Sequence, residues 1–169
     1  VVSVVGRSNS GKTTLLEKLI VELKRRGYTV AAVKHSGSGF QLDHPGKDSW
    51  RFAKAGSDAV MLASPKGLAF LQKASHPPTF QEVTDFLGNR YDFILVEGFK
   101  ESGAPKIEVH RKELGSLVTP PEELFALVTD EQLDVSVPQF SSRDGVALVD
   151  LLEKRLAVPS WARTALPDG

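Results

Sequence analysis

The sequence predicts an α/β fold with a mainly parallel sheet. Short apolar runs alternate with amphipathic stretches, and a glycine-rich turn joins the first such pair. The 169 residues, 41% of them hydrophobic and 25% charged, suit one globular domain. The 21 basic and 21 acidic residues balance, whereas proteins that grip nucleic acid through its phosphates are usually strongly basic. We therefore expect no nucleic-acid partner.

The first third of the chain contains the clearest elements. Residues 1–5 form an apolar run, which is typical of a strand covered on both faces. Residues 13–26 place their leucines and isoleucine on one stripe, which predicts an amphipathic helix, and Gly27 follows where helices commonly end. Residues 29–33 are predicted to be a second strand. Glycines and a Pro-Gly pair in residues 35–46 indicate a loop.

The middle of the chain departs from simple strand-helix alternation. A short helix is predicted over residues 47–55. Residues 58–63 and 68–72 are two short β-rich runs around a Ser-Pro-Lys-Gly turn, which predicts a hairpin. A helix is predicted over residues 79–87, where a threonine and a glutamate three residues later have the spacing of a capping box.

The last part of the chain returns to alternation. Strands are predicted at residues 93–96, 106–110, 125–129 and 135–140, and a final helix at residues 145–156. Neither the hairpin nor the strand at 106–110 fits a βαβ scheme. Both are therefore expected as additions at a sheet edge, where a partner often covers them.

These elements define one domain, residues 1–156, with residues 58–73 as a hairpin addition. Residues 157–169 contain two prolines and little pattern, so a loosely attached tail is expected. The absence of cysteine excludes a disulfide framework, a thiolate zinc site and a cysteine nucleophile. The apolar start is too short for a membrane span or a signal-peptide core. We expect no membrane anchor and a cytoplasmic location.

The turn between the first strand and helix carries the strongest motif. Gly6-Arg7-Ser8-Asn9-Ser10-Gly11-Lys12-Thr13 matches G-x-x-x-x-G-K-[ST], the phosphate-binding loop of P-loop NTPases. Glycines let the backbone approach an anion closely, and the helix N-terminus presents its positive dipole end to the phosphates. The lysine reaches the β- and γ-phosphates and the threonine hydroxyl serves Mg²⁺. The predicted nucleotide-binding residues here are Gly6, Asn9, Ser10, Gly11, Lys12, Thr13 and Thr14.

Two acidic residues are candidates for the magnesium site and catalysis. Glu97 ends the apolar strand 93–96, and ligands bind at the carboxyl ends of strands in open α/β sheets. Asp43 lies in the loop after the second strand, at the same predicted edge. With Thr13, these carboxylates are predicted to hold Mg²⁺, and with Lys12 they form the predicted catalytic set. A strand-end cap for Glu97 and a turn residue for Asp43 are the alternatives.

Further candidates follow other strands. Lys34 and His35 directly follow the second strand and are predicted near the phosphates; a solvated loop histidine is the alternative for His35. Asp130 follows a late strand, and its carboxylate is able to accept both guanine N1–H and N2–H₂; a turn role is the alternative. The basic side chains around residues 106–110 are interpreted as a solvated face, with a surface for an anionic ligand as the alternative. They are Lys100, Lys106, Arg111 and Lys112.

Beyond the phosphate loop, the chain resembles the MobB family of molybdopterin-guanine dinucleotide biosynthesis adapter proteins. The P-G-K-D-S-W and V-E-G-F-K segments are far more selective than the loop itself. The resemblance covers residues 1–156 and rests on five segments: Gly6–Thr14, Val33–His35, Asp43–Trp50, Ala55-Gly56 and Val96–Lys100.

This resemblance implies more than the residues alone. Family members bind GTP with Mg²⁺, hydrolyse it slowly at most, form homodimers and assist the guanylyltransferase that joins GMP to molybdopterin. By position, Lys12 and Thr13 would be the nucleotide and Mg²⁺ residues, with Asp43 and Glu97 as acidic partners. The family usually has further histidines after the Lys-His pair, where this chain has Ser36-Gly37-Ser38-Gly39.

Other functions remain open at this stage. The Val-Glu-Gly segment is also similar to that of dethiobiotin synthetase, so an ATP-dependent small-molecule kinase or ligase is the alternative. A nickel metallochaperone GTPase is disfavoured because there are no cysteines and the four histidines are scattered. Arg7 is a candidate for reaching a partner subunit's nucleotide, although long charged side chains usually face solvent.

Overall fold

The computed structural model describes residues 1–37, 39 and 44–156, and the chain divides into two compact units. The first unit contains residues 1–35 and the chain from Phe80 onward, and the second contains Ser36–Thr79. The predicted tail at 157–169 lies outside the described residues. In the described part of the chain, no helix is both long and apolar enough to span a membrane.

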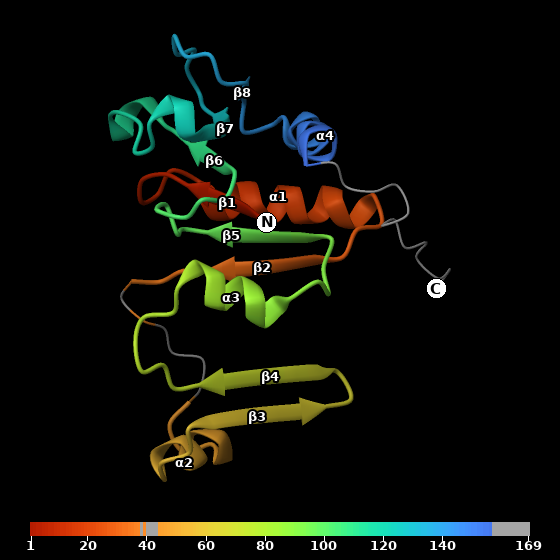
Figure 1. Ribbon diagram of the computed structural model, residues 1–169, viewed down its shortest axis with the longest axis vertical. Helices are drawn as coiled ribbons and strands as arrows, with labels where there is room; N and C mark the ends of the chain where they lie inside the picture. The colour runs from red at the N-terminus through yellow and green to blue at the C-terminus, as the bar shows by residue number, and fades with distance from the viewer. Residues whose placement is uncertain (38, 40–43, 157–169) are drawn as a thin grey trace. The chain divides into compact units, whose positions relative to one another are not determined.

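A six-stranded sheet in the order β2-β5-β1-β6-β7-β8 organises the first unit, and every neighbouring pair is parallel. Figure 1 shows the arrowheads of β2 and β5 at one edge, which we call the carboxyl edge. The predicted α/β class with a mainly parallel sheet is confirmed. The strands are β1 (Val2–Val5), β2 (Val30–Lys34), β5 (Phe93–Glu97), β6 (Lys106–Val109), β7 (Leu124–Val128) and β8 (Gln139–Phe140).

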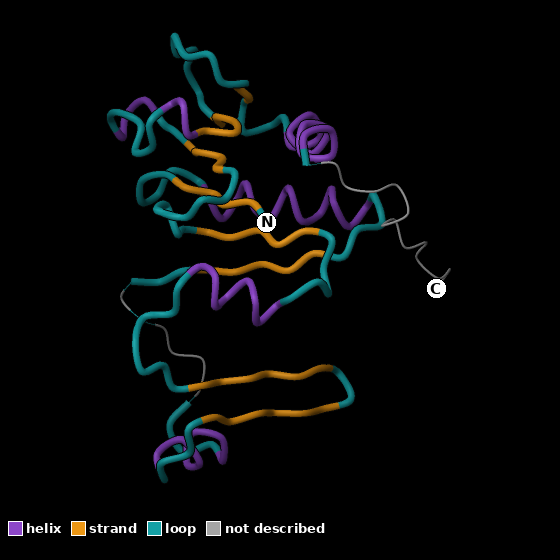
Figure 2. The backbone as a smooth tube through the Cα atoms, in the orientation of Figure 1, coloured by secondary structure: helices purple, strands orange, loops and turns teal. Residues whose placement is uncertain are grey.

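Helices cover both faces of this sheet (Figure 2). Leucines of α1 (Lys12–Arg25) and α4 (Gly145–Arg155) form the larger core with β1, β5, β6 and β7. On the other face, α3 (Phe80–Leu87) packs its two end residues against Ala31, Ile94 and Val96. Successive residues of β5 therefore enter opposite cores, which explains why its sequence is continuously apolar.

The strand at residues 106–110 is not an edge addition, and that prediction was wrong. β6 lies inside the sheet between β1 and β7 and is parallel to both. Its charged side chains are buried but paired: Lys106 Nζ lies 3.0 Å from Glu123 Oε2. Glu108, 1% exposed, accepts N–H bonds from Val118 and Thr119 at 2.8 and 2.9 Å. The strand was expected at an edge because it does not fit a βαβ scheme, whereas hydrogen bonds and an ion pair with residues outside the strand allow its charged side chains to be buried inside the sheet.

β8 is shorter than predicted. Residues 135–138 are not part of the strand, which contains only Gln139 and Phe140. Pro138 precedes it and has no N–H to donate to a ladder. The Gln139 side chain instead exchanges two hydrogen bonds with the Leu133 backbone, at 3.0 and 2.7 Å. The Leu133 backbone is therefore satisfied by a side chain, while the Pro138 carbonyl accepts the Leu127 N–H of β7 at 2.9 Å.

An ion-pair network fixes the end of α1 to α4. Arg25 and then Arg26 donate to the Glu22 carboxylate, and these hydrogen bonds lower the pKa of Glu22 to about 2. Arg26 also donates to Glu153 at 2.8 Å, and Glu153 accepts the Tyr28 hydroxyl at 2.8 Å. The network lies at the opposite end of α1 from the glycine-rich loop, so it stabilises the scaffold without entering the site.

The second unit contains α2 (Asp48–Lys54) and an antiparallel hairpin of β3 (Ala59–Ser64) and β4 (Gly67–Gln72). The predicted hairpin is confirmed. Its expected place at the edge of the main sheet is wrong, because β3 and β4 pair only with each other in the described residues. Val60 is buried, while the exposed apolar side chains of the hairpin are Met61, Leu62, Leu68 and Phe70, at 39–73%.

Candidate functional site

The glycine-rich turn joins β1 to α1 at the carboxyl edge. Gly6 has a φ of 136°, and a Cβ on it would lie 2.4 Å from the Val109 carbonyl oxygen at the end of β6. Gly11 caps α1 with a φ of 99°, and Asn9 has a φ of 62°. Only glycine tolerates the close approach at Gly6. The turn is therefore shaped by packing against β6 and leads directly into the helix N-terminus.

Lys12 folds back over this loop. Its Nζ donates to the Arg7 carbonyl oxygen at 2.7 Å, and the residue is half-buried. Ser10 is 1% exposed, and its hydroxyl has no hydrogen-bond partner among the residues described. A cation held above a loop that begins a helix is the arrangement that binds phosphate in P-loop proteins.

Thr13 and Glu97, two of the residues predicted to hold Mg²⁺, lie within hydrogen-bond distance of each other. The Thr13 hydroxyl donates to Glu97 Oε2 at 2.9 Å, although 84 residues separate them. Lys34 Nζ lies 3.8 Å from Glu97 Oε1, because Lys34 and Glu97 are register partners in β2 and β5. A hydroxyl and a carboxylate are oxygen donors of the kind that Mg²⁺ prefers, so the residues present fit that ion.

His35 lies beside the glutamate strand but is held by an aromatic ring. Its backbone N–H donates to the Glu97 carbonyl at 2.9 Å, and its ring centroid is 4.2 Å from that of Phe99. A Cβ on Gly98 would lie 3.0 Å from His35 Cβ, and Gly98 has a φ of 101°. Gly98 therefore allows the chain of His35 to pass close by. Contact of His35 with nucleotide remains a prediction.

Asp130 follows β7 and already has two neighbours. Its Oδ1 accepts the Lys112 backbone N–H at 3.2 Å, and its Oδ2 lies 3.8 Å from Arg111 Nη1. The predicted recognition of guanine by Asp130 is not tested by this geometry. Asp43 lies outside the described residues, so its place in the magnesium site also remains a prediction.

Arg111 is the residue that sequence reasoning missed. Its Nε donates to the Ser10 carbonyl at 3.1 Å, so it contacts the phosphate loop rather than belonging to a solvated face. It lies two residues after the end of β6, and β6 lies next to β1. Had that strand been placed inside the sheet, the residue after it would have been expected beside the loop.

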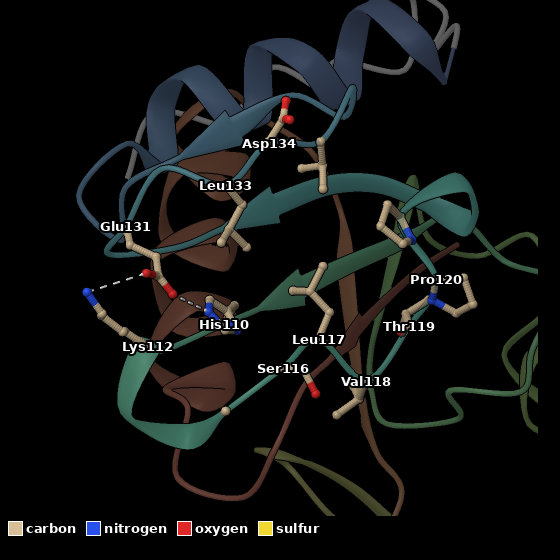
Figure 3. Close-up of a pocket in the computed structure, with 13 residues that line it drawn as sticks. His110, Lys112, Ser116, Leu117, Val118, Thr119, Pro120, Glu131, Leu133 and Asp134 are labelled. Carbon is tan, nitrogen blue, oxygen red and sulfur yellow. Dashed lines mark hydrogen bonds and ion pairs between the residues drawn. The ribbon is translucent and has the colours of Figure 1, made fainter.

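The Arg7 side chain contacts another segment of its own chain. Its Nε donates to the Ser116 carbonyl at 3.2 Å. Ser116 lines a cavity of about 800 Å³ beside the carboxyl end of β6 (Figure 3). In this cavity His110 Nε2 lies 2.9 Å from Glu131 Oε1. The far wall contains the chain around Leu133. The loop that carries Arg7 is thus braced against the cavity rim.

The chain matches a known family model and several characterised proteins. Residues 1–130 match the model described as molybdopterin guanine dinucleotide synthesis protein B, MobB. The molybdopterin-guanine dinucleotide biosynthesis adapter protein of Haemophilus influenzae is 40% identical over 138 residues, which cover 78% of this chain and 75% of that protein. The protein of the same name from Escherichia coli K12 is 35% identical over 157 residues, 86% of each chain.

Solved structures agree with the sequence relatives. A crystal structure of molybdopterin-guanine biosynthesis protein B superposes with a TM-score of 0.71 at 29% identity, covering 92% of this chain and 98% of that chain. Bacillus subtilis MobB gives a TM-score of 0.71 at 28% identity, covering 90% and 96%. The similarity therefore extends over nearly the whole chain in both comparisons.

Proposed function

The chain belongs to the molybdopterin guanine dinucleotide synthesis protein B (MobB) family, and we propose that it acts as a GTP-binding adapter in that synthesis. The observation that carries the nucleotide part is the meeting of the phosphate loop with Thr13 and Glu97 at one sheet edge. The guanine preference and the adapter role are supported by the names of the relatives.

Each group at this edge has a defined task in the proposed site. Lys12 exchanges its bond to the Arg7 carbonyl for phosphate oxygens, which are stronger acceptors because they are charged. Backbone amides at the start of α1 donate to the same phosphates. Thr13, Glu97 and Asp43 would hold Mg²⁺, which neutralises phosphate charge when it is bound. Lys34, Asn9 and Thr14 complete the polar rim of the proposed site.

Hydrolysis of GTP is proposed to be slow. Rapid GTPases orient the attacking water with a glutamine, and the residues after Glu97 are Gly98, Phe99 and Lys100. A protein that binds GTP firmly and turns it over slowly suits an adapter, because the bound nucleotide persists while a partner docks. The proposed partner is the guanylyltransferase that joins GMP to molybdopterin, in the cytoplasm.

The test is calorimetric titration of the purified chain with GTP and ATP, each with and without Mg²⁺. We expect GTP with Mg²⁺ to bind at least about tenfold more tightly than ATP, a difference of about 1.4 kcal/mol. Addition of guanylyltransferase should then give a complex whose amount depends on GTP. Tight ATP binding with weak GTP binding would instead favour the small-molecule kinase or ligase alternative.

The hairpin supports a proposed homodimer. β3 and β4 expose apolar side chains, and an isolated two-stranded hairpin is at best marginally stable in water. Among the described residues β3 and β4 form a sheet of two strands, to which a further strand could be added. We propose that a second copy of this chain covers the hairpin, as the family resemblance implies.

Replacing Leu68, 73% exposed in the hairpin, with aspartate should weaken this dimer. A charge placed in an apolar interface must be desolvated or the interface must open. Sedimentation equilibrium should give a dimer mass for the wild type and a largely monomeric mass for Leu68→Asp. Val21→Asp, at an exposed apolar position on α1, is the matched control and should remain dimeric. A wild-type monomer at all concentrations would refute the dimer.

A further inference from the structure

The Arg111 side chain lies against the phosphate loop, although it is about 100 residues away in the sequence. Its Nε donates to the Ser10 carbonyl at 3.1 Å. Its Nη2 lies 3.4 Å from the place that a Cβ on Gly11 would occupy, directly at the start of α1. The side chain is 22% exposed, so most of it is removed from water. The guanidinium therefore lies against the half of the loop from which the helix begins.

Electrostatics makes this a costly place for a cation. The N-terminus of a helix carries about half a positive charge, and cations are stabilised at the opposite end. Lys12 adds a second full positive charge on the same loop. Close to the guanidinium, Asp130 Oδ2 lies 3.8 Å from Nη1, beyond ordinary hydrogen-bond length. A polyanion between the guanidinium, the lysine and the helix end would convert this repulsion into attraction.

We propose that Arg111 contacts the phosphates of the bound nucleotide, and that Asp130 positions Arg111. This inference rests on the proposed nucleotide site and adds a residue to it. A guanidinium has five N–H donors in a planar fork that matches phosphate oxygens, and the Ser10 carbonyl uses one of them. Arg111 thereby approaches the phosphates from the β6 side, opposite Glu97 on the β5 side.

Asp130 has the geometry of a guide for this side chain. One carboxylate oxygen is fixed by the Lys112 backbone N–H at 3.2 Å, and the other faces the guanidinium. At 3.8 Å it orients Arg111 without holding it in a short ion pair. The guanidinium therefore keeps N–H donors free for a ligand while Asp130 orients the side chain. This orientation reduces the conformational entropy that Arg111 loses when a ligand binds.

The first test titrates wild type, Arg111→Ala, Arg111→Lys and Lys12→Ala with GTP and XTP in the presence of Mg²⁺. Arg111→Ala should weaken both nucleotides by the same factor, about tenfold or more, because phosphates are common to them. Arg111→Lys should recover part of the loss. Arg90→Ala removes an equal charge from the end of α3, where Arg90 donates to backbone carbonyls, and should change neither affinity.

The outcomes separate this inference from the site on which it rests. If wild type binds neither nucleotide, the proposed function fails. If Lys12→Ala loses affinity and Arg111→Ala stays within twofold of wild type, the nucleotide site stands and the role of Arg111 is overturned. A loss confined to GTP would also overturn it, because Arg111 would then serve the base. Thermal melting of each variant checks that the fold is retained.

Asp130→Asn provides the second test. If Asp130 positions Arg111, Asp130→Asn should weaken the binding of GTP and of XTP by similar factors. Both factors should be smaller than those of Arg111→Ala. In the double variant Arg111→Ala/Asp130→Asn, the second change should weaken nucleotide binding by less than a further factor of two, because the side chain that Asp130 positions is no longer present. If Asp130→Asn instead weakens GTP while strengthening XTP, the carboxylate reads the base and the positioning role is overturned.

Discussion

Replacing Lys12 with alanine should reduce the affinity for GTP by about 30-fold or more while the fold remains intact. Charge-assisted hydrogen bonds are worth about 2 kcal/mol or more, and 1.4 kcal/mol corresponds to a factor of ten. The folded state should lose little, because among the described residues the Lys12 ammonium is hydrogen-bonded to a loop carbonyl alone, at 2.7 Å. Calorimetric titration and a thermal melt measure the two effects separately.

Lys24→Ala is the matched control for this change. Lys24 lies on the same helix and likewise donates to a backbone carbonyl, that of Tyr28, at 3.0 Å. Twelve residues of helix separate the two lysines, about 18 Å. Lys24→Ala should bind GTP as wild type does. Equal affinity in Lys12→Ala and wild type would overturn the assignment of the phosphate loop.

Local chemistry explains why the first strand, the phosphate loop and α1 could be predicted together. Each loop position has its own requirement: glycine at Gly6 and Gly11 for backbone shape, lysine and threonine for ligand contact. The apolar run before the loop predicts a strand, and the apolar stripe after it predicts a helix. Strand, loop and helix signals of this kind depend on residues that are close in sequence. The fold class could be predicted because strand and helix patterns alternate along the chain.

β6 was misplaced because its partners lie far along the chain. Lys106 pairs with Glu123, 17 residues away, and Glu108 accepts amides 10 and 11 residues away. The edge position was expected because the strand does not fit the βαβ alternation of the rest of the chain. In this protein, tertiary contacts pair the charged side chains of β6. The periodicity of a single sequence carries no information about such contacts. The same error concealed Arg111, whose place beside the loop depends on β6 being next to β1.

The proximity of Thr13 and Glu97 was predicted from a general rule for parallel sheets, not from a local sequence pattern. Ligands of parallel sheets gather where the strands end, so two residues 84 positions apart were expected at one edge. The finer arrangement could not be predicted. Lys34 lies 3.8 Å from Glu97 because of the β2-β5 register, and the His35 ring lies on Phe99. Both depend on side-chain packing in three dimensions.

Glu97→Gln should change GTP binding in opposite directions with and without Mg²⁺. With Mg²⁺, the variant loses a charged oxygen ligand, so the enhancement of GTP affinity by the ion should fall at least about tenfold. Without Mg²⁺, the negative charge of Glu97 repels the phosphates, so its removal should raise the affinity for GTP. The Lys34 pair, with an exposed lysine, contributes little to either result.

The opposite signs make this result specific to a metal-holding carboxylate. A general loss of structure would weaken binding under both conditions. Glu101→Gln removes the same charge from an exposed position four residues later and should match wild type in both titrations. Thr13→Ala should share the loss of Mg²⁺ enhancement but not the gain without the ion, because it removes no charge. An unaltered Mg²⁺ dependence in Glu97→Gln would remove Glu97 from the site and leave Thr13 without its partner carboxylate.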